Sequence, residues 1–105
     1  MFIAVYRYTL KPGMEDQFRV DWAMVTYAGI YDGKSLGSSL GQAADGSWVA
    51  VGRWPTKQQR DDWFARNTDI VEPLARMRKA MDQRFDDLEV DVTDELSSTV
   101  SPSTA

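Results

Sequence analysis

The first strand of this chain already limits the folds open to it. Residues 2–11 alternate with a period of two, and apolar side chains occur on both sides of the alternation. One side carries Phe2, Ala4, Tyr6, Tyr8 and Leu10, and the other begins with Ile3 and Val5. A strand with two apolar sides belongs at the centre of a sheet that is covered on both faces. The fold must therefore provide a covering layer on each side.

The next patterns indicate a helix followed by a hairpin. Residues 14–30 repeat an apolar or small side chain every three or four positions, which predicts an amphipathic helix. The stripe consists of Met14, Phe18, Trp22, Val25 and Gly29. Residues 36–42 form a strand of small side chains, and the turn signal Asp45-Gly46 connects it to an alternating strand at residues 48–54.

The second half contains two helix signals and a final strand. Thr56 is the predicted N-cap of a helix, with Gln59 closing a capping box. Pro73 fits the first turn of a further helix. One face of that helix is lined by Leu74, Met77, Met81 and Phe85. Residues 87–92 alternate between acidic and aliphatic side chains, which predicts a fourth strand.

The order of these elements predicts an α+β fold. Strand, helix, strand, strand, helix and strand is the ferredoxin-like βαββαβ plait, an antiparallel four-stranded sheet with its helices on one face. We expect this domain to occupy residues 1–92. Residues 93–105 are acidic and then rich in Ser and Thr, and we expect them to form a disordered tail.

One face of the predicted sheet has no covering layer within the chain. Ile3, Val5, Val49 and Val51 would form an apolar patch on that face. Burial of the patch against a second copy of the chain is the simplest way to remove it from water. We therefore expect a homodimer.

Composition excludes several classes of chemistry and of partner. The chain contains no cysteine and no histidine, so disulfides, Cys- or His-ligated zinc and haem, and Ser-His-Asp relays are excluded. The net charge is −4, and no run of basic residues suits nucleic acid. No apolar stretch approaches the roughly 20 residues of a membrane span. We expect a cytoplasmic protein with no cofactor, no metal, and no nucleic-acid or membrane partner.

Three segments of the chain resemble a known family. They are residues 2–18 (FIAVYRYTLKPGMEDQF), 33–40 (GKSLGSSL) and 44–55 (ADGSWVAVGRWP), followed by Trp63. Their order and spacing resemble antibiotic biosynthesis monooxygenase-type domains over roughly residues 1–92. The resemblance implies a dimeric α/β barrel, in which two sheets pack face to face and each subunit keeps a pocket between its sheet and its helices.

Members of that family include cofactor-independent oxygenases of aromatic polyketides, quinol monooxygenases and haem-degrading enzymes. The haem-degrading branch uses an Asn on the first strand, a Trp on the second helix and a His on the helix that follows. Here Trp63 matches the Trp, Tyr6 stands in place of the Asn, and no His exists. Haem degradation with a His ligand is therefore rejected.

Aromatic side chains make up most of the candidate site. Oxygenation without metal or flavin requires the substrate, as a deprotonated phenol or hydroquinone, to reduce O₂ itself in a dry pocket. The candidate catalytic residues are Tyr6, Trp63 and Asn67, and the candidate substrate-binding residues are Tyr8, Trp54, Trp22 and Phe64. Tyrosine hydroxyls are donors and not bases at neutral pH, because the reference pKa of Tyr is about 10. The expected ligand is a small aromatic molecule.

Two functions are compatible with these residues. One is a cofactor-independent monooxygenase of an aromatic or quinol-like small molecule, and the other is a non-catalytic small-ligand-binding or assembly module of the same fold. Ordinary core packing explains the aromatic residues equally well, because aromatic side chains dominate protein cores. The small residues Gly37, Ser38, Ser39, Gly41 and Gly52 favour a cavity, since a sheet face with little side-chain volume must be filled by something.

Overall fold

Strand β1 (Phe2–Leu10) lies at the centre of the sheet, as predicted. The structure, a computed structural model, describes residues 1–97. One edge of β1 pairs antiparallel with β3 (Trp48–Trp54), which pairs in turn with β2 (Gly37–Gln42). The predicted hairpin and the central position of the first and third strands are both confirmed.

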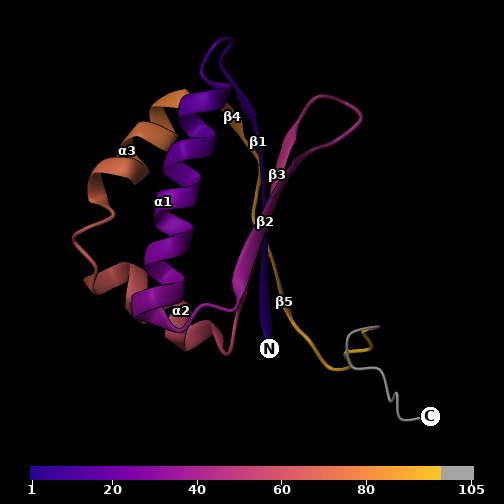
Figure 1. Ribbon diagram of the computed structural model, residues 1–105. Helices are drawn as coiled ribbons and strands as arrows, with labels where there is room; N and C mark the ends of the chain where they lie inside the picture. The colour runs from indigo at the N-terminus through magenta and orange to yellow at the C-terminus, as the bar shows by residue number, and fades with distance from the viewer. Residues whose placement is uncertain (98–105) are drawn as a thin grey trace.

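The other edge of β1 pairs with two short strands instead of one. β4 (Met81–Arg84) pairs with the C-terminal half of β1, and β5 (Leu88–Asp91) pairs with its N-terminal half. Both pairings are antiparallel, and Figure 1 shows β4 and β5 following one another along β1. The strand predicted at residues 87–92 is therefore present as β5, and β4 is an addition to the predicted plait.

The last helix ends earlier than the sequence predicts. Its apolar spacing continues through Met81 and Phe85, but α3 (Val71–Ala80) ends before both residues. The backbone of β1 needs hydrogen-bond partners along its whole length, and this requirement outweighs the local helical pattern. Phe85 donates its backbone N–H to the carbonyl of Arg7 (3.0 Å), and the Arg7 guanidinium lies 4.5 Å from the centre of the Phe85 ring.

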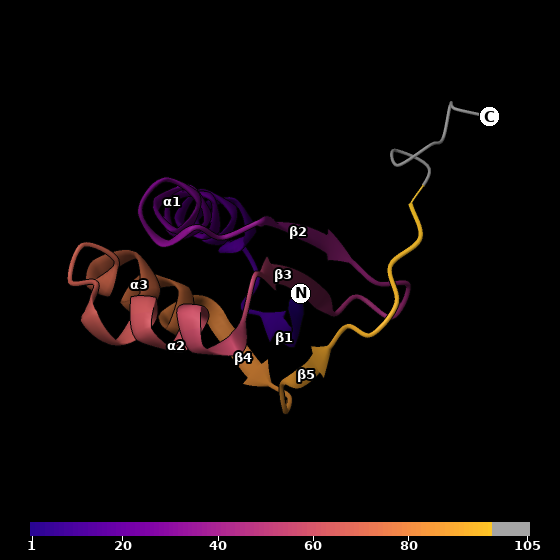
Figure 2. The same cartoon turned by 90° about the horizontal axis from the view of Figure 1, so that it is seen from below.

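The helices all lie on one face of the sheet, as Figures 1 and 2 show. α1 (Glu15–Gly33) extends past its predicted end, and Lys34 then terminates it in a left-handed conformation (φ 63°). α2 (Lys57–Arg66) begins as predicted, because the Thr56 hydroxyl accepts a hydrogen bond from the Gln59 backbone N–H (3.1 Å). The helical layer covers one sheet face only.

The hydrophobic core lies between the sheet and the helical layer. It consists of Phe2, Ala4, Tyr8, Phe18, Val25, Ala50, Trp54, Trp63, Ile70, Met77 and Ala80. α1 also buries Asp21, whose carboxylate pairs with Arg76 of α3 (2.9 Å) and accepts a hydrogen bond from Gln17 (3.0 Å). Burial opposes the charge on Asp21, but these hydrogen bonds outweigh it and lower its pKa. The pair joins α1 to α3.

Close contact between α1 and α2 depends on Gly33. A Cβ atom at this position would lie 2.7 Å from two ring carbons of Trp63. Such a distance is well inside van der Waals contact, and the indole cannot retreat because it is almost fully buried. The absence of a side chain at Gly33 therefore lets the end of α1 pack on Trp63.

We expect Gly33→Ala to lower the free energy of unfolding by about 1–3 kcal/mol, because the added methyl group overpacks this contact. Urea unfolding followed by tryptophan fluorescence measures the change. Gly41→Ala is the matched control, since its new Cβ meets no atom within 4 Å, and we expect a change below about 0.5 kcal/mol. Equal losses in the two variants would contradict the role given to Gly33.

The second face of the sheet carries no helix within residues 1–97, as Figure 2 shows. Aliphatic side chains gather on it, and together they are named the outer sheet face: Ile3, Val5, Val49, Val51, Leu88 and Val90. Leu88 and Val90 are 60% and 39% exposed, respectively. The predicted apolar patch is therefore present and extends onto β5. Its burial against a second copy stays a prediction.

Residues beyond β5 add no further element to the described fold. Residues 92–97 have no regular secondary structure. The rest of the predicted disordered tail, residues 98–105, lies outside the described residues. Within residues 1–97, none of the helices combines the length and apolar character that crossing a membrane requires.

Candidate functional site

A cavity of about 430 Å³ opens between the sheet and the helical layer. β1 and β3 form its floor, and all three helices contribute to its walls. The floor is low because β3 presents Ala50 and Gly52 there. Of the small residues expected to leave a hollow, Gly37, Ser38 and Gly52 line the cavity, and Ser39 and Gly41 do not. Three of the five small residues therefore lie at the cavity, as the sequence analysis expected.

Aromatic residues predicted from the sequence converge on this cavity. Those that line it are Tyr6, Tyr8, Trp22, Trp54, Trp63 and Phe64. The ring centres of Trp54 and Trp63 are 5.6 Å apart, and those of Trp63 and Phe64 are 4.9 Å apart. Tyr8, Trp54 and Trp63 belong to the buried core, whereas Tyr6, Trp22 and Phe64 are partly buried, so the cavity wall combines core rings with half-exposed ones.

Trp63 uses its indole N–H within the protein. The side chain is 1% exposed, and Nε1 donates a hydrogen bond to Asp32 Oδ2 at the end of α1 (3.2 Å). This N–H already has an acceptor within the protein, so donation to a ligand would require breaking that bond. Contact with the ring is what Trp63 offers to a ligand.

Asn67 does not reach the cavity. It is the C-cap residue of α2, and its Oδ1 accepts a hydrogen bond from the backbone N–H of Asp69 (2.9 Å). This is an Asx turn, which shapes the loop between α2 and α3. The side chain thus serves the loop and is not part of the cavity lining, and nothing in its position supports the catalytic role predicted for Asn67.

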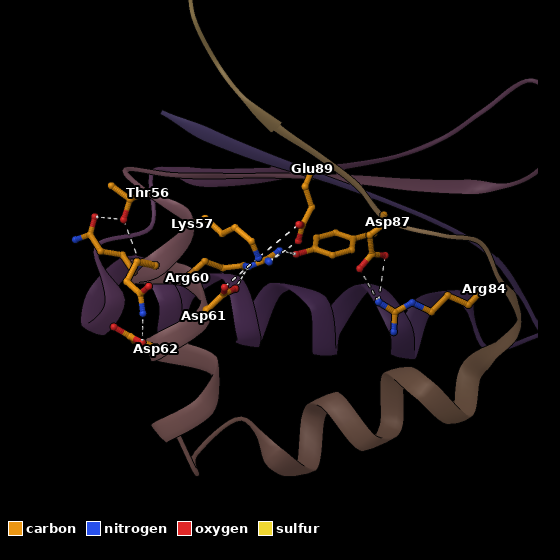
Figure 3. Close-up of polar contacts among 11 residues, drawn as sticks. Thr56, Lys57, Arg60, Asp61, Asp62, Arg84, Asp87 and Glu89 are labelled. Carbon is orange, nitrogen blue, oxygen red and sulfur yellow. Dashed lines mark hydrogen bonds and ion pairs between the residues drawn. The ribbon is translucent and has the colours of Figure 1, made fainter.

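Arg60 on α2 lines the cavity and was not identified from the sequence. Its buried guanidinium donates to Tyr6 Oη (3.1 Å), Glu89 Oε2 (2.6 Å) and Asp61 Oδ1 (2.9 Å), and Figure 3 shows these contacts meeting around it. Burial is the largest single influence and disfavours the charge on Arg60, but the contacts with Glu89, Tyr6 and Asp61 together outweigh it and raise the pKa of Arg60. The hydrogen bond from Arg60 lowers the pKa of Glu89. The network joins α2 to β1 and β5.

This network leaves the proton of Tyr6 available. Because Arg60 donates to the phenolic oxygen, the O–H of Tyr6 is not used in that bond and can be donated to a second acceptor. A positive charge beside the oxygen also makes the hydroxyl a stronger donor. Since Tyr6 lines the cavity, a ligand oxygen there can be the second acceptor.

Tyr8 lies two residues further along β1 and lines the same cavity. Its side chain is 3% exposed, and burial is the main reason that its pKa is raised, with Arg84 acting in the opposite direction. Tyr8 therefore keeps its proton at neutral pH and can act as a donor, in agreement with the sequence analysis. The floor thus offers two phenol groups from one strand.

Acidic residues that line the cavity are held in ion pairs. Arg84 donates to both carboxylate oxygens of Asp87 (3.1 Å each). Asp61 is held by Lys57 (3.0 Å) and by Arg60, and these hydrogen bonds lower its pKa. Among the described lining residues, Asp61 and Asp87 are the carboxylates, so neither is a free base.

The sequence did contain signals for this network. Arg60 precedes Trp63 by three residues and Phe64 by four, so the three side chains share one face of α2. Glu89 lies opposite Ala4 in the sheet register, which places it on the helix-facing side. Neither Arg60 nor Glu89 was among the site candidates that the sequence analysis named.

The cavity favours a flat ligand that bears oxygen atoms. Its walls are aromatic, and the polar groups aimed at it include the phenol donors of Tyr6 and Tyr8. Contacts with the partly buried rings of Trp22 and Phe64 and hydrogen bonds to ligand oxygens are the interactions such a lining supplies. In the part of the chain that the structure describes, no three Asp or Glu side chains are grouped so as to hold a metal ion.

Comparison with known proteins identifies the fold. No family model matches the sequence, and neither does any curated protein. SnoaB, a cofactor-independent oxygenase from Streptomyces nogalater, is similar in structure (TM-score 0.74, 13% identity, 90% of this chain and 95% of that chain). A candidate antibiotic biosynthesis monooxygenase from Chloroflexus aurantiacus is also similar, with a TM-score of 0.72 and 12% identity over 91% of this chain and 96% of that chain. Rv0793 from Mycobacterium tuberculosis has a TM-score of 0.72 and 19% identity over 91% of this chain and 98% of that chain. The chain therefore has the fold of antibiotic biosynthesis monooxygenase-type structures.

We expect Gly52→Leu to weaken binding of an aromatic probe, 1,8-dihydroxyanthrone, by at least about tenfold, because the new side chain rises from the cavity floor. Quenching of tryptophan fluorescence measures the dissociation constant. Gly52→Ala is the control, since its Cβ meets no atom closer than 3.9 Å. Equal affinities in the two variants would mean that the probe binds outside this cavity.

Proposed function

We propose that the protein is a cofactor-independent monooxygenase that oxidises an aromatic or quinol-like small molecule with O₂. The observation that carries the proposal is the aromatic cavity in which Arg60 holds the oxygen of Tyr6 and leaves its proton free for a ligand. The fold that the chain shares with SnoaB, described as a cofactor-independent oxygenase, also supports it.

The proposed reaction balances without a cofactor. An anthrone-type substrate loses a proton, and its anion transfers one electron to O₂. The two radicals combine at carbon to give a peroxide anion. This anion takes one proton from solvent, and the resulting hydroperoxide loses water and leaves a carbonyl group. One oxygen atom thus enters the product and the other leaves as water, while the methylene carbon of the substrate supplies the electrons.

Each group in the cavity has a defined task in this proposal. Tyr6 and Tyr8 donate hydrogen bonds to the substrate oxygen on which negative charge develops. Trp54, Trp63 and Phe64 hold the ring system and exclude water from the radical pair. Because Asp61 and Asp87 are engaged in ion pairs, the proton that the bound substrate loses goes to solvent.

A non-catalytic ligand-binding module of the same fold is the second candidate. Two observations favour it: the Trp63 N–H is bonded to Asp32, and the carboxylates among the described lining residues are paired. Trp63, Asp61 and Asp87 are then not available to move a proton to or from a substrate. This candidate predicts binding of the aromatic probe without oxygen consumption.

We also propose that the protein is a homodimer through the outer sheet face. Six aliphatic side chains on one uncovered face support this, because burial of apolar area stabilises association by roughly 25 cal/mol per Å² before its costs are subtracted. Each subunit would keep its own cavity, since the cavity lies on the opposite side of the sheet.

We expect Tyr6→Phe to lower kcat for oxidation of 1,8-dihydroxyanthrone by at least about tenfold. The variant keeps the ring but loses a hydrogen bond to a charged oxygen, which is worth about 1.5–3 kcal/mol. Oxygen uptake, measured with an electrode, gives kcat, and KM should change less, because the charge develops in the transition state.

Tyr27→Phe is the matched control, because Tyr27 lies on the exposed side of α1 and not in the cavity. It should oxidise the substrate at the wild-type rate. Probe binding by the wild-type protein with no oxygen uptake above the uncatalysed background would reject the monooxygenase and support the ligand-binding module.

A further inference from the structure

A second apolar surface lies on the exposed side of α1. Val20, Met24, Tyr27 and Tyr31 are 55%, 49%, 63% and 86% exposed, and together they are named the outer α1 stripe. Their spacing of four, three and four residues places them in one line along the helix. The rings of Tyr27 and Tyr31 stack on each other with centres 6.5 Å apart, so the stripe has an ordered aromatic end.

α1 is thus apolar on two opposite sides. Phe18, Val25 and Gly29 face the core, whereas the outer α1 stripe faces away from it. A helix that is apolar on both sides is normally buried on both sides. Figure 2 shows α1 at the margin of the helical layer, with no element of residues 1–97 beyond it. The stripe therefore lacks a partner within the described chain.

We propose that the outer α1 stripe binds the same stripe of a second copy of this chain, with the two helices antiparallel. A two-fold axis between Met24 and Tyr27 brings each Met24 against Tyr27 of the other copy. The same axis brings Val20 against Tyr31. A flexible or small side chain then meets a tyrosine ring at every position, which is the self-complementarity that a two-fold interface requires.

Charges at the two ends of α1 select this arrangement. Asp16 lies four residues before Val20, and Lys34 lies three residues after Tyr31, each about 13–14 Å from the proposed axis along the helix. Antiparallel packing places Asp16 of one copy near Lys34 of the other. Parallel packing would instead bring like charges together at both ends.

Both charged groups are available for such a contact. Asp16 is 99% exposed and its one ion pair within residues 1–97 is a 4.0 Å contact with Arg19. Lys34 is exposed and has no ion pair in the same part of the chain. Antiparallel helices also bring the positive N-terminal end of one dipole beside the negative C-terminal end of the other. Charge and shape therefore point to the same partner.

This contact is independent of the proposed reaction, and it uses a different surface from the outer sheet face. The stripe belongs to the helical layer, whereas the outer sheet face is on the other side of the sheet. Both contacts can then form at once. If the sheet-face homodimer exists, the second interface joins two dimers into a tetramer.

Sedimentation of the full chain between 5 and 100 μM tests the proposal. We expect a wild-type mass of about four times the chain mass of 11.9 kDa. Met24→Glu should reduce it to two chains, because burying a carboxylate in the stripe is unfavourable. Val51→Glu should also leave two chains, now joined through α1. Val71→Glu, at an exposed position on α3, is the matched control and should keep four.

A charge exchange tests the antiparallel register. Asp16→Lys should raise the dissociation constant of the stripe contact by about two- to tenfold, since an exposed ion pair contributes up to about 1 kcal/mol. Combining Asp16→Lys with Lys34→Asp should restore it. Failure of the double variant to recover association would overturn the antiparallel arrangement.

Two results would overturn the interface itself. One is that Met24→Glu has the same mass as the wild-type protein, whatever the number of chains in the wild-type assembly. The other is binding of phosphatidylcholine vesicles that Met24→Glu abolishes without altering the mass, which would assign the stripe to a lipid surface. Absence of the sheet-face homodimer gives a different result. The wild-type protein would then contain two chains, and Val51→Glu would not change its mass.

Discussion

Hydrogen bonding of the β1 backbone is the constraint to which the rest of the structure adapts. β3 satisfies one edge, and β4 and β5 share the other. The side chains of β1 then divide between two tasks. Phe2 and Ala4 close the core, while Tyr6 and Tyr8 reach the cavity. One strand therefore sets both the sheet and the floor of the site, and the backbone that builds the core also positions the two phenols.

Arg60 connects the chemistry of the site to an outlying part of the fold. A buried guanidinium is stable only with partners, and its shortest bond is to Glu89 on the edge strand β5. The hydrogen bond that orients Tyr6 therefore depends on a strand of four residues. Lys57 adds a second contact to the same carboxylate (3.5 Å), so α2 holds this edge at two points.

Periodicity predicted the parts of the fold that repeat, and missed those decided by distant contacts. The alternation of residues 2–11 and the cap at Thr56 were sufficient because local pattern and final structure agree there. β4 was not predicted because Met81 continues the helical spacing of the preceding residues. In the structure Met81 pairs with Leu10 of β1, which is far away in the sequence. At the site, Asn67 was chosen for its residue type alone, and Arg60 was overlooked because its partners Tyr6 and Glu89 lie far from it in the sequence.

The division of one sheet edge between β4 and β5 has a consequence for solubility. An uninterrupted outer strand would present a straight row of free amide and carbonyl groups on which another chain could add. Here the row is broken after Arg84, and the second piece carries Glu89 and Asp91. Growth of cross-β fibres from this margin is therefore opposed by both the interruption and the negative charge.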